Sequence, residues 1–442
     1  MKLKYSFFIL LFVLFQVNLA KAQTSFNKVD SLLTELEDNN IAIGSVSIFK
    51  EGKEVYNRSF GQKNIPNKIS QKNNRYQIGS ITKMVTATLI FKLIEDNKLS
   101  LDTKLEQFYP EIPNSDKITV KNLLEHSSGL GDYVSKDGDE TWLTQRVSSQ
   151  DIINEIIRQG VLFQPNEKTK YSNSAYYLLA GILDKLYKKD YNSIIIKEII
   201  KPLRLKSFKS YLPKQNKIFR SFSFSDKWET VKEFDFSNVI GVGDITSTTH
   251  DMNLFINSLF KGKLLSKESL NIMKPDTTTK EVYGRGMYIM PFYNFSFYGH
   301  AGDTYGTHTT VGYNADLDLS YSIMLNASRY ERNEIYIAIL SNLFEKNYEL
   351  PNYTIIKLFA EELDKYLGNY TNTEIPLEVF VFVENNVLKA QAKNQEAIIL
   401  DCYEGNKFVN EANGLKIEFL PQENKLILLQ GGERVEMNRI GE

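Results

Sequence analysis

Cysteine is nearly absent from this chain of 442 residues, which contains only Cys402. One cysteine excludes an intramolecular disulfide and any zinc or iron–sulfur site that is built on several thiolates. Cys402 lies in the apolar segment "AIILDCYEG", and no histidine follows it in the chain. We therefore expect a buried structural thiol at this position rather than a nucleophile.

Histidine is also scarce, with four residues in the whole chain. His300 and His308 are eight residues apart, which is about 26 Å along one extended strand. A metal pair would need a turn between them, and no third ligand stands at a recognised spacing, so we expect no metal site. We expect His126, in "LLEHSSGL", to end a helix, and His250 to cap or pack near its own helix.

An excess of charge of either sign is missing as well. The 53 basic residues balance 54 acidic ones, and the net charge is −1. Such a balance, without a basic face or a nucleic-acid-binding motif, argues against a nucleic-acid partner. Hydrophobic residues make up 42% of the chain, which is enough for a large core, and the length predicts two or three domains.

Long apolar runs are confined to the N-terminus. The basic start "MKLKY" precedes "SFFILLFVLF", and small residues follow at Ala20 and Ala22. This order predicts a signal peptide over residues 1–22 that is cleaved near Ala22, with an uncleaved anchor as the alternative. No cysteine lies near the cleavage point, so we expect no lipid anchor. The mature chain would be periplasmic or secreted, without a stable membrane span.

Residues 25–345 mix helix-like and strand-like segments, which predicts an α+β fold whose antiparallel sheet joins both ends of the domain. The expected elements are a helix over 25–40, two strands over 41–61 around the turn Lys50–Lys53, a helix from about Ser80 to a cap at Asn97, a helix between the cap Ser149 and Gly160, a helix over 173–190, a helix after the glycine-rich loop at 241–243, three or four antiparallel strands over 283–327, and a helix over 333–346.

The tail has a different pattern. From about residue 362 the sequence alternates apolar and polar residues, and turns are expected at Asn385-Asn386, Asn413-Gly414, Glu423-Asn424 and Gly431-Gly432. This pattern predicts a meander of short strands without a helical segment, in a small β-barrel or sandwich. The predicted domains are therefore residues 23–350 and 362–442, after the signal peptide at 1–22.

The stretch "RYQIGSITKMVTATLIFKLIED" places Ser80 three residues before Lys83 at the start of an apolar helix. On a helix these side chains lie on the same face, so the amine can reach the hydroxyl. Burial penalises the ammonium form and makes a neutral amine available as a base. The helix N-terminus adds amide donors for a developing oxyanion. These features are typical of a serine nucleophile that is activated by lysine.

The same spacing occurs at Ser47–Lys50 and at Ser258–Lys261. Ser47 belongs to a strand pattern, in which residues i and i+3 point to opposite faces. Ser258 is expected at the end of a helix, with Lys261 in a turn. Neither pair combines a helix start with an apolar environment, so the spacing favours Ser80 only together with its context.

Two further motifs accompany Ser80. Tyr171-Ser172-Asn173 precedes an apolar helix, and His300-Ala301-Gly302 lies on an expected core strand, whereas Tyr370-Thr371-Asn372 falls in the tail. The order Ser-x-x-Lys, Tyr-x-Asn and His-x-Gly resembles the serine β-lactamase and penicillin-binding-protein superfamily, in its class C-like branch. The resemblance covers about residues 25 to 345, and the tail resembles the lipocalin-like barrel that many members carry. It implies a β-lactamase-like fold with a helical subdomain beside the sheet.

The resemblance implies roles for the residues that match these motifs. Ser80 would be the acylated nucleophile and Lys83 the proton acceptor during its attack. Tyr171 would share the proton relay and activate the deacylating water. No metal or organic cofactor would be needed.

The remaining positions would bind substrate. The resemblance implies that Asn173 bonds the substrate amide and that the backbone N–H groups of Ser80 and Asp303 form the oxyanion hole. His300 and Gly302 would line the strand along which the substrate docks, and a glycine suits such a close approach of backbone to ligand.

His300 marks a departure, because class C β-lactamases carry lysine at this position. A histidine is mostly neutral near pH 7 and offers no fixed cation for a substrate carboxylate. The expected function is an exported serine hydrolase that acts on an amide or ester, with a β-lactam, a D-amino-acid peptide or an ester as the substrate and the cell wall as one source of it. The alternative is a non-catalytic protein that binds cell-wall peptides.

Overall fold

The structure is a computed structural model that describes residues 26–440 except 66–74, 140, 212–217, 225–226, 276–282, 347, 349–354, 373–376, 393–394, 396, 411–413 and 431–432. The predicted signal peptide and the turn residues Asn413 and Gly431-Gly432 fall outside this part. The chain divides into two compact units, Leu36–Ala327 and Ser328–Glu442 together with the residues up to Glu35. The predicted domain boundaries stay a prediction. No helix of the described part has the length and apolarity that a membrane crossing requires.

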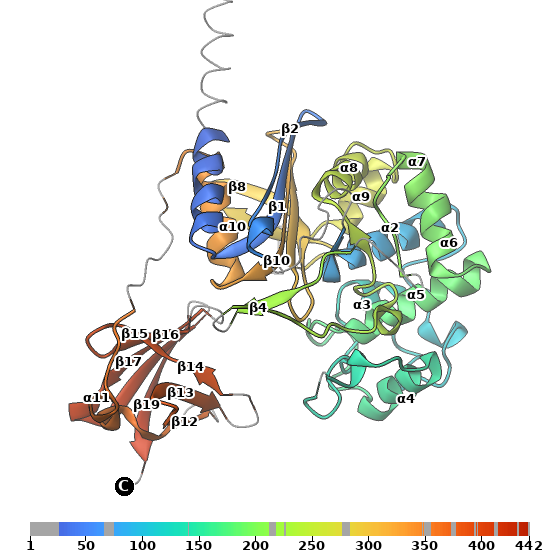
Figure 1. Cartoon of the computed structure of the whole chain (residues 1–442). Coiled ribbons are helices and arrows are strands. Elements are labelled where there is room, and N and C mark those ends of the chain that lie inside the picture. Colours follow the sequence, from blue (N-terminus) through green and yellow to red (C-terminus); the bar gives the residue numbers. More distant parts are fainter. Residues whose placement is uncertain are drawn as a thin grey trace, which may run out of the picture. The chain divides into compact units, whose positions relative to one another are not determined.

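An antiparallel sheet organises the unit Leu36–Ala327, as predicted (Figure 1). Its strands follow the order β2-β1-β10-β9-β8-β7, and the short β4 joins β10 in parallel and β5 antiparallel. The bounds are β1 Ala42–Lys50, β2 Lys53–Phe60, β4 Phe222–Phe224, β5 Trp228–Thr230, β7 Tyr288–Phe292, β8 Phe295–Asp303, β9 His308–Asn314 and β10 Leu319–Ser328. Strands β3 (Tyr76–Gln77) and β6 (Thr246–Ser247) form a separate pair.

The hairpin of β1 and β2 turns at Glu51 and Gly52, whose φ angles are 53° and 75°. Two successive residues at positive φ give a turn whose twist matches that of the flanking strands. Residues 42–49 of β1 are all buried, whereas β2 alternates exposed and intermediate residues. Strand β1 is therefore an interior strand with both faces covered, and β2 is the edge of the sheet.

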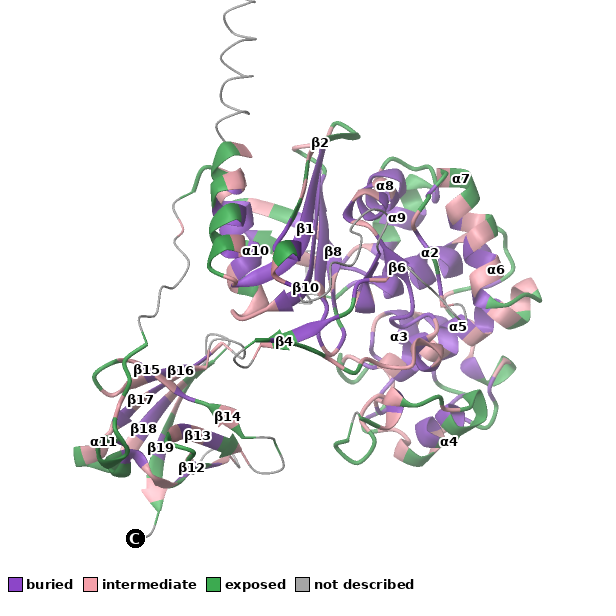
Figure 2. Cartoon of the chain, viewed as in Figure 1, coloured by how far each residue is buried: buried purple, intermediate pink, exposed green. Residues whose placement is uncertain are grey.

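Helix α2, Thr82–Glu95, follows a 3-10 turn at Gly79–Ile81 and is buried nearly all round (Figure 2). It contacts helices α5 and α9 and, through the turn, strand β8. The chain leaves the helix through Asn97, which has a φ of 57°, so the predicted cap is confirmed. The other helices of this unit are α3 Val120–Leu124, α4 Ser149–Gln159, α5 Asn173–Tyr187, α6 Tyr191–Ile195, α7 Lys201–Leu203, α8 Thr249–Phe260 and α9 Lys267–Met273.

The predicted cap of helix α4 is wrong by one residue. Ser148, not Ser149, has extended backbone angles, and its side chain accepts a hydrogen bond from the Asp151 N–H. Two adjacent serines offer the same capping chemistry, and the first one precedes the helix because Ser149 already has helical geometry. The predicted end at Gly160 is confirmed, with a φ of 64°.

The tail folds into a nine-stranded antiparallel sheet with the order β14-β13-β12-β11-β19-β18-β17-β16-β15. Strands β14 and β15 stand at opposite ends of this order but are separated in sequence only by Leu400, so the sheet curves round into a nearly closed barrel. Cys402 is buried in its core, as predicted. The bounds are β11 Gly368–Thr371, β12 Glu378–Glu384, β13 Val387–Ala392, β14 Ile398–Ile399, β15 Asp401–Glu404, β16 Lys407–Asn410, β17 Leu415–Leu420, β18 Lys425–Gln430 and β19 Glu433–Ile440.

Two details of the tail correct the prediction of a meander without helix. Helix α11 (Ala360–Leu363) and a 3-10 turn at Asp364–Tyr366 precede the first strand. Another 3-10 turn, Pro421–Glu423, leads into Asn424. These single turns carry too few residues for a helical period to be visible in the sequence. Helix α10 (Arg332–Leu343) also belongs to this unit.

Candidate active site

Three side chains meet at the hydroxyl of Ser80. The Lys83 Nζ donates to Ser80 Oγ at 2.9 Å, and the Tyr171 hydroxyl donates to the same oxygen at 2.9 Å. Ser80 lies on the 3-10 turn before α2, and Tyr171 lies in the loop before α5. The predicted pair on one helix and the tyrosine 91 residues away therefore converge on one atom.

Lys83 is fully buried, and burial lowers the pKa of its amine to about 7, against a smaller opposing influence from the Asp132 carboxylate. A lysine with this pKa is partly neutral near pH 7 and can accept a proton. Its amine also donates to the Val242 carbonyl at 3.2 Å, and it lies 4.9 Å from the centre of the Tyr171 ring. These contacts fix the amine beside Ser80 Oγ.

The Tyr171 ring rests on His126. Their ring centres are 4.4 Å apart in a stacked arrangement, and His126 Nδ1 accepts the Ser172 N–H at 3.2 Å. Burial, followed by the nearby Lys83, holds the pKa of His126 well below its usual value, so the ring is neutral. Burial also raises the pKa of Tyr171 well above its ordinary value. His126 ends helix α3 as predicted, and in addition it supports the tyrosine.

Asn173 is held by a residue that the sequence interpretation missed. Its side-chain Nδ2 donates to Asp132 Oδ2 at 2.9 Å, and its backbone N–H reaches the same oxygen at 3.3 Å. Asp132 also accepts the Val134 N–H at 3.1 Å, and burial raises the pKa of its carboxyl. Asp132 directly follows the quoted "LLEHSSGL" and Gly131, so the extension of that segment to the next acidic residue could have indicated it.

Strand β8 passes close to the Ser80 turn. A Cβ added at Gly302 would lie 2.0 Å from the Ile78 carbonyl oxygen and 2.9 Å from the Ser80 nitrogen. A Cβ added at Gly79 would lie 2.7 Å from the Asp303 nitrogen. Two glycines are therefore required where the strand and the turn touch, and their contact brings the backbone nitrogens of Ser80 and Asp303 into one region.

His300 is buried on β8 rather than exposed to solvent. Its ring packs edge-on against the Tyr288 ring, with 4.8 Å between the ring centres, and its Nδ1 donates to the Ala301 carbonyl. Burial, with a further contribution from the charge of Lys83, lowers the pKa of His300 to about 3. The imidazole is therefore neutral across the physiological range and supplies no cation.

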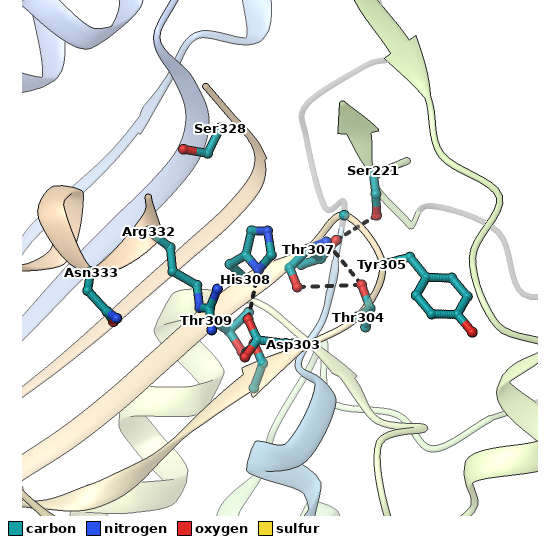
Figure 3. A network of polar contacts seen from close by, with 12 residues as sticks. Ser221, Asp303, Thr304, Tyr305, Thr307, His308, Thr309, Ser328, Arg332 and Asn333 are labelled. Carbon is teal, nitrogen blue, oxygen red and sulfur yellow. Dashed lines mark hydrogen bonds and ion pairs between the residues drawn. The ribbon is translucent and has the colours of Figure 1, made fainter. Parts of the chain in front are cut away.

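The turn between β8 and β9 is held by polar side chains from within the turn and from a neighbouring segment. Figure 3 shows His308 bonded to Asp303 across the two strand ends, with an Nδ1–Oδ1 distance of 2.7 Å. Thr307 bonds Ser221 at 2.7 Å, and its N–H donates to Thr304 Oγ1 at 3.0 Å. Within the described residues no group of three or more His, Cys, Asp or Glu side chains could hold a metal ion.

A cavity of about 220 Å³ opens beside Ser80. Its polar lining comes from Ser80, Asn173, Asp303 and Thr304, and no lysine, arginine or histidine is found among the lining residues that the structure describes. The remaining wall is mostly apolar, so a neutral group of a ligand fits against it. The other lining residues are Gly79, Val134, Phe234, Val239, Val242, Gly243 and Tyr305.

The two other Ser-x-x-Lys pairs are not sites of this kind. The Ser47 hydroxyl donates to Glu54 at 2.7 Å, while Lys50 reaches the Leu317 carbonyl. Lys261 forms an ion pair with Asp318 at 3.0 Å. His250 packs beside its helix as predicted, where its ring nitrogen lies 2.8 Å from Glu54.

The sequence matches the Beta-lactamase family over residues 29–357. This match spans well over half of the chain, and the chain therefore belongs to that family. The fold and the family together define a protein of β-lactamase type.

Two curated relatives and one solved structure illustrate the similarity. The chain is 30% identical to the putative penicillin-binding protein PbpX of Bacillus subtilis over 56% of this chain and 62% of that protein, which is less than two thirds of its length. It is 27% identical to a teichoic acid D-alanine hydrolase of Staphylococcus aureus over 72% of this chain and 77% of the relative. The octameric penicillin-binding protein homologue from Pyrococcus abyssi, 24% identical, covers 93% of this chain and 100% of its own with a TM-score of 0.65, which shows the shared fold.

Proposed function

We propose that this chain is an exported hydrolase that cleaves an ester or amide through an acyl intermediate on Ser80. One observation carries the proposal: Ser80 Oγ lies 2.9 Å from both the Lys83 amine and the Tyr171 hydroxyl, and the amine is buried and has a pKa of about 7. A nucleophile within hydrogen-bond reach of a base whose pKa is near the working pH is the arrangement that acyl transfer needs.

Acylation begins when Ser80 Oγ attacks the substrate carbonyl and its proton passes to the neutral Lys83 amine. Tyr171 keeps its own proton, because its pKa is raised well above the ordinary value. It is therefore the group that donates a proton to the leaving oxygen or nitrogen, and Lys83 restores that proton. The substrate bond breaks, and the acyl group remains on Ser80 as an ester.

The developing oxyanion would accept hydrogen bonds from the backbone N–H groups of Ser80 and Asp303. The close contact of Gly79 and Gly302 supports this role, because it brings both nitrogens into one region next to the nucleophile's backbone. The Asn173 side chain, oriented by Asp132, would bond the amide or ester group of the substrate, while Gly302 lines the docking strand. In deacylation, water attacks the ester and gives a proton to the neutral Lys83 amine. Tyr171 donates its proton to Ser80 Oγ as the ester bond breaks, and Lys83 returns a proton to Tyr171.

The substrate class follows from the charges around the cavity. His300 is neutral, and the described residues of the cavity wall supply no cation for a substrate carboxylate. This supports D-amino-acid esters, and peptides without a free carboxylate beside the scissile bond, over penicillins. The relative named teichoic acid D-alanine hydrolase supports the same class, and the apolar N-terminal run supports export. A protein that only binds such peptides would not need a buried amine beside Ser80.

Mass spectrometry of the intact protein tests this proposal. A fluorophosphonate should add one mass equivalent to the wild type and to Ser258→Ala, which serves as the matched control, and none to Ser80→Ala. Circular dichroism confirms that each variant folds. An adduct on Ser80→Ala would contradict the nucleophile assignment. Turnover of p-nitrophenyl esters, D-alanyl peptides and a chromogenic cephalosporin then ranks the substrates, with the cephalosporin expected last.

A further inference from the structure

A second cavity lies in the unit Leu36–Ala327, away from Ser80. It has a volume of about 310 Å³, at the lower end of the range of ligand pockets, which is roughly 300–1,000 Å³. Two tyrosine rings and two carboxylates contribute to its wall. The lining residues are Tyr109, Glu111, Ser149, Gln150, Ile153, Tyr177, Ala180, Gly181, Asp184, Ser237 and Ile240.

The Asp184 carboxylate is poorly compensated in this wall. Its Oδ1 is buried and has no hydrogen-bond partner among the described residues. Burial, followed by repulsion from Asp190 and Asp244, raises the pKa of its carboxyl to about 7. A buried anionic oxygen without a partner is costly. The carboxyl also lines the cavity, so a positively charged group bound there would stabilise its anionic form.

The aromatic part of the wall is built for a close fit. A Cβ at Gly181 would lie 1.8 Å from the Tyr109 hydroxyl, so this glycine makes room for the ring. Lys185 places its amine 3.6 Å from the centre of the Tyr109 ring, so one face of the ring already holds a cation and the ring offers a ligand its remaining surface. Tyr177 packs against Tyr133 at 5.3 Å between ring centres, and its position is therefore fixed.

We propose that this cavity binds a compact organic ammonium ion, with Asp184 as its counter-ion and Tyr109 and Tyr177 as its aromatic wall. Electrostatic attraction to a carboxylate and to ring faces is the chemistry by which proteins bind such cations. Glu111 at the rim adds a second negative charge. Among the described lining residues an anionic ligand would meet two carboxylates and no cation, and the nearby Lys185 amine is held on the Tyr109 ring.

A bare divalent metal ion fits the wall less well. It would need about six oxygen ligands at short distance, whereas the tyrosine rings and the side chains of Ile153, Ala180 and Ile240 supply mostly apolar surface. No group of three or more potential metal-ligating side chains is found in the described residues. An ammonium ion with methyl or methylene groups matches both the carboxylate and the apolar wall.

Two segments of the chain contribute lining residues both to the second cavity and to the catalytic cleft. Asn173 lines the cleft from the first turn of α5, and Tyr177, Ala180 and Asp184 line the second cavity from later turns of the same helix. Val239 and Ile240 are adjacent residues that line the cleft and the second cavity, respectively. The two sites are therefore separate but neighbouring, and blocking Ser80 leaves the second one open.

Calorimetric titration of the mature chain with tetramethylammonium chloride, against sodium chloride at equal ionic strength, tests the proposal. One saturable site is expected in the wild type. Asp184→Asn should weaken binding at least about tenfold, the value of one lost charge interaction of roughly 1.4 kcal/mol. Glu106→Gln should bind like the wild type, because it removes an exposed carboxylate that is not among the lining residues of the cavity. Thermal unfolding verifies that both variants fold.

A second arm separates the cavity from the catalytic cleft. Protein that has been labelled with a fluorophosphonate, and the variant Ser80→Ala, should both bind tetramethylammonium with unchanged affinity. Loss of binding in these two samples would place the cation in the cleft and overturn the proposal. Absence of saturable binding to the wild type, equal binding by Asp184→Asn, or saturation by Mg²⁺ or Ca²⁺ alone would overturn it as well. None of these outcomes depends on whether Ser80 is catalytic.

Discussion

The pairs Ser80–Lys83 and Ser258–Lys261 have the same spacing but different surroundings. Lys83 has no exposed surface, and its amine contacts Ser80 Oγ and the Val242 carbonyl. The Lys261 side chain is 35% exposed and forms an ion pair with Asp318. Helix α2 begins just after Ser80, whereas α8 ends at Phe260, just before Lys261.

This difference teaches that the spacing only lets a lysine side chain reach the serine, whereas burial of the lysine decides whether its amine can act as a base. A lysine in water keeps its proton, and a carboxylate beside it strengthens that preference. Lys83 loses the water and has a carboxylate, Asp132, only as a weaker influence. Each variant changes a buried ionisable group and, where the chain offers one, is compared with a matched residue outside the candidate site.

Replacing Lys83 or Lys261 by alanine should give the largest difference in acylation rate between the two pairs. In Lys83→Ala, acylation of Ser80 by a fluorophosphonate should slow by about 10³-fold, because general-base catalysis contributes typically 10²–10⁴-fold. Lys261→Ala should react at the wild-type rate. Stopped-flow or quenched mass measurements give the rates, and circular dichroism confirms the fold. Wild-type acylation in Lys83→Ala would refute its role as the base.

The hydroxyl of Tyr171 should have the next largest effect. Tyr171→Phe keeps the ring stacked on His126 but removes the donor to Ser80 Oγ, and ester turnover should fall by about 10²-fold. Tyr370→Phe is the matched control, because Tyr370 belongs to the Tyr-x-Asn sequence of the tail and donates to the Tyr366 carbonyl. Steady-state kinetics on a p-nitrophenyl ester decide the matter. Equal losses in both variants would count against a catalytic hydroxyl.

The pH dependence of kcat/KM should report the protonation of the Lys83 amine. Because the neutral amine is the active form in the proposed mechanism, kcat/KM should rise with pH through about 7, the pKa of Lys83. The Asp132 carboxylate raises this pKa, so Asp132→Asn should move the rising limb to lower pH by up to roughly one unit. A merely structural role of Asp132 would lower activity without moving the limb. A shift to higher pH would contradict the electrostatic assignment.

The smallest expected effect concerns stability at Asp184. Its carboxyl has a pKa of about 7 in the folded chain against an ordinary value of 3.8, so the folded state holds its proton longer than the unfolded state. Stability from this group is present at low pH and is lost as the pH rises from about 4 to about 7. Asp184→Asn should therefore flatten that decline and raise Tm at pH 8 by a few degrees. Thermal unfolding at several pH values checks this, and an equally steep decline in the variant would contradict it.

Much of the fold could be read from local patterns. Turn residues such as Gly52 and Asn97 need positive φ, and the apolar run after Ser80 has no polar face to expose, so hairpin and buried helix were predictable. The cap at Ser148 was assigned one residue too late, because Ser149 has the same chemistry. The short helical turns before and within the barrel were missed, because so few residues show no period.

The candidate site was only partly predictable, for a geometric reason. Ser80, Tyr171 and Asn173 stand in recognisable motifs, but Asp132 holds Asn173 from a loop 41 residues earlier in the chain. The Val242 carbonyl lies 159 residues from Lys83, and backbone atoms leave no trace in a sequence. Glu233, which accepts bonds from the Thr304 hydroxyl and from the N–H groups of Tyr305 and Gly306, is likewise invisible before folding.

By itself the sequence determined the residue types of the proposed reaction: a serine and a lysine three positions apart, a tyrosine, an asparagine and a histidine where a permanent cation could have stood. Only the tertiary structure decided their chemistry. It buried Lys83 and thereby brought the pKa of its amine to about 7, and it buried His300 and thereby kept its imidazole neutral. Residue type sets which proton a group can carry, and the surrounding solvent and charges, which exist only in the fold, set the pH at which it does so.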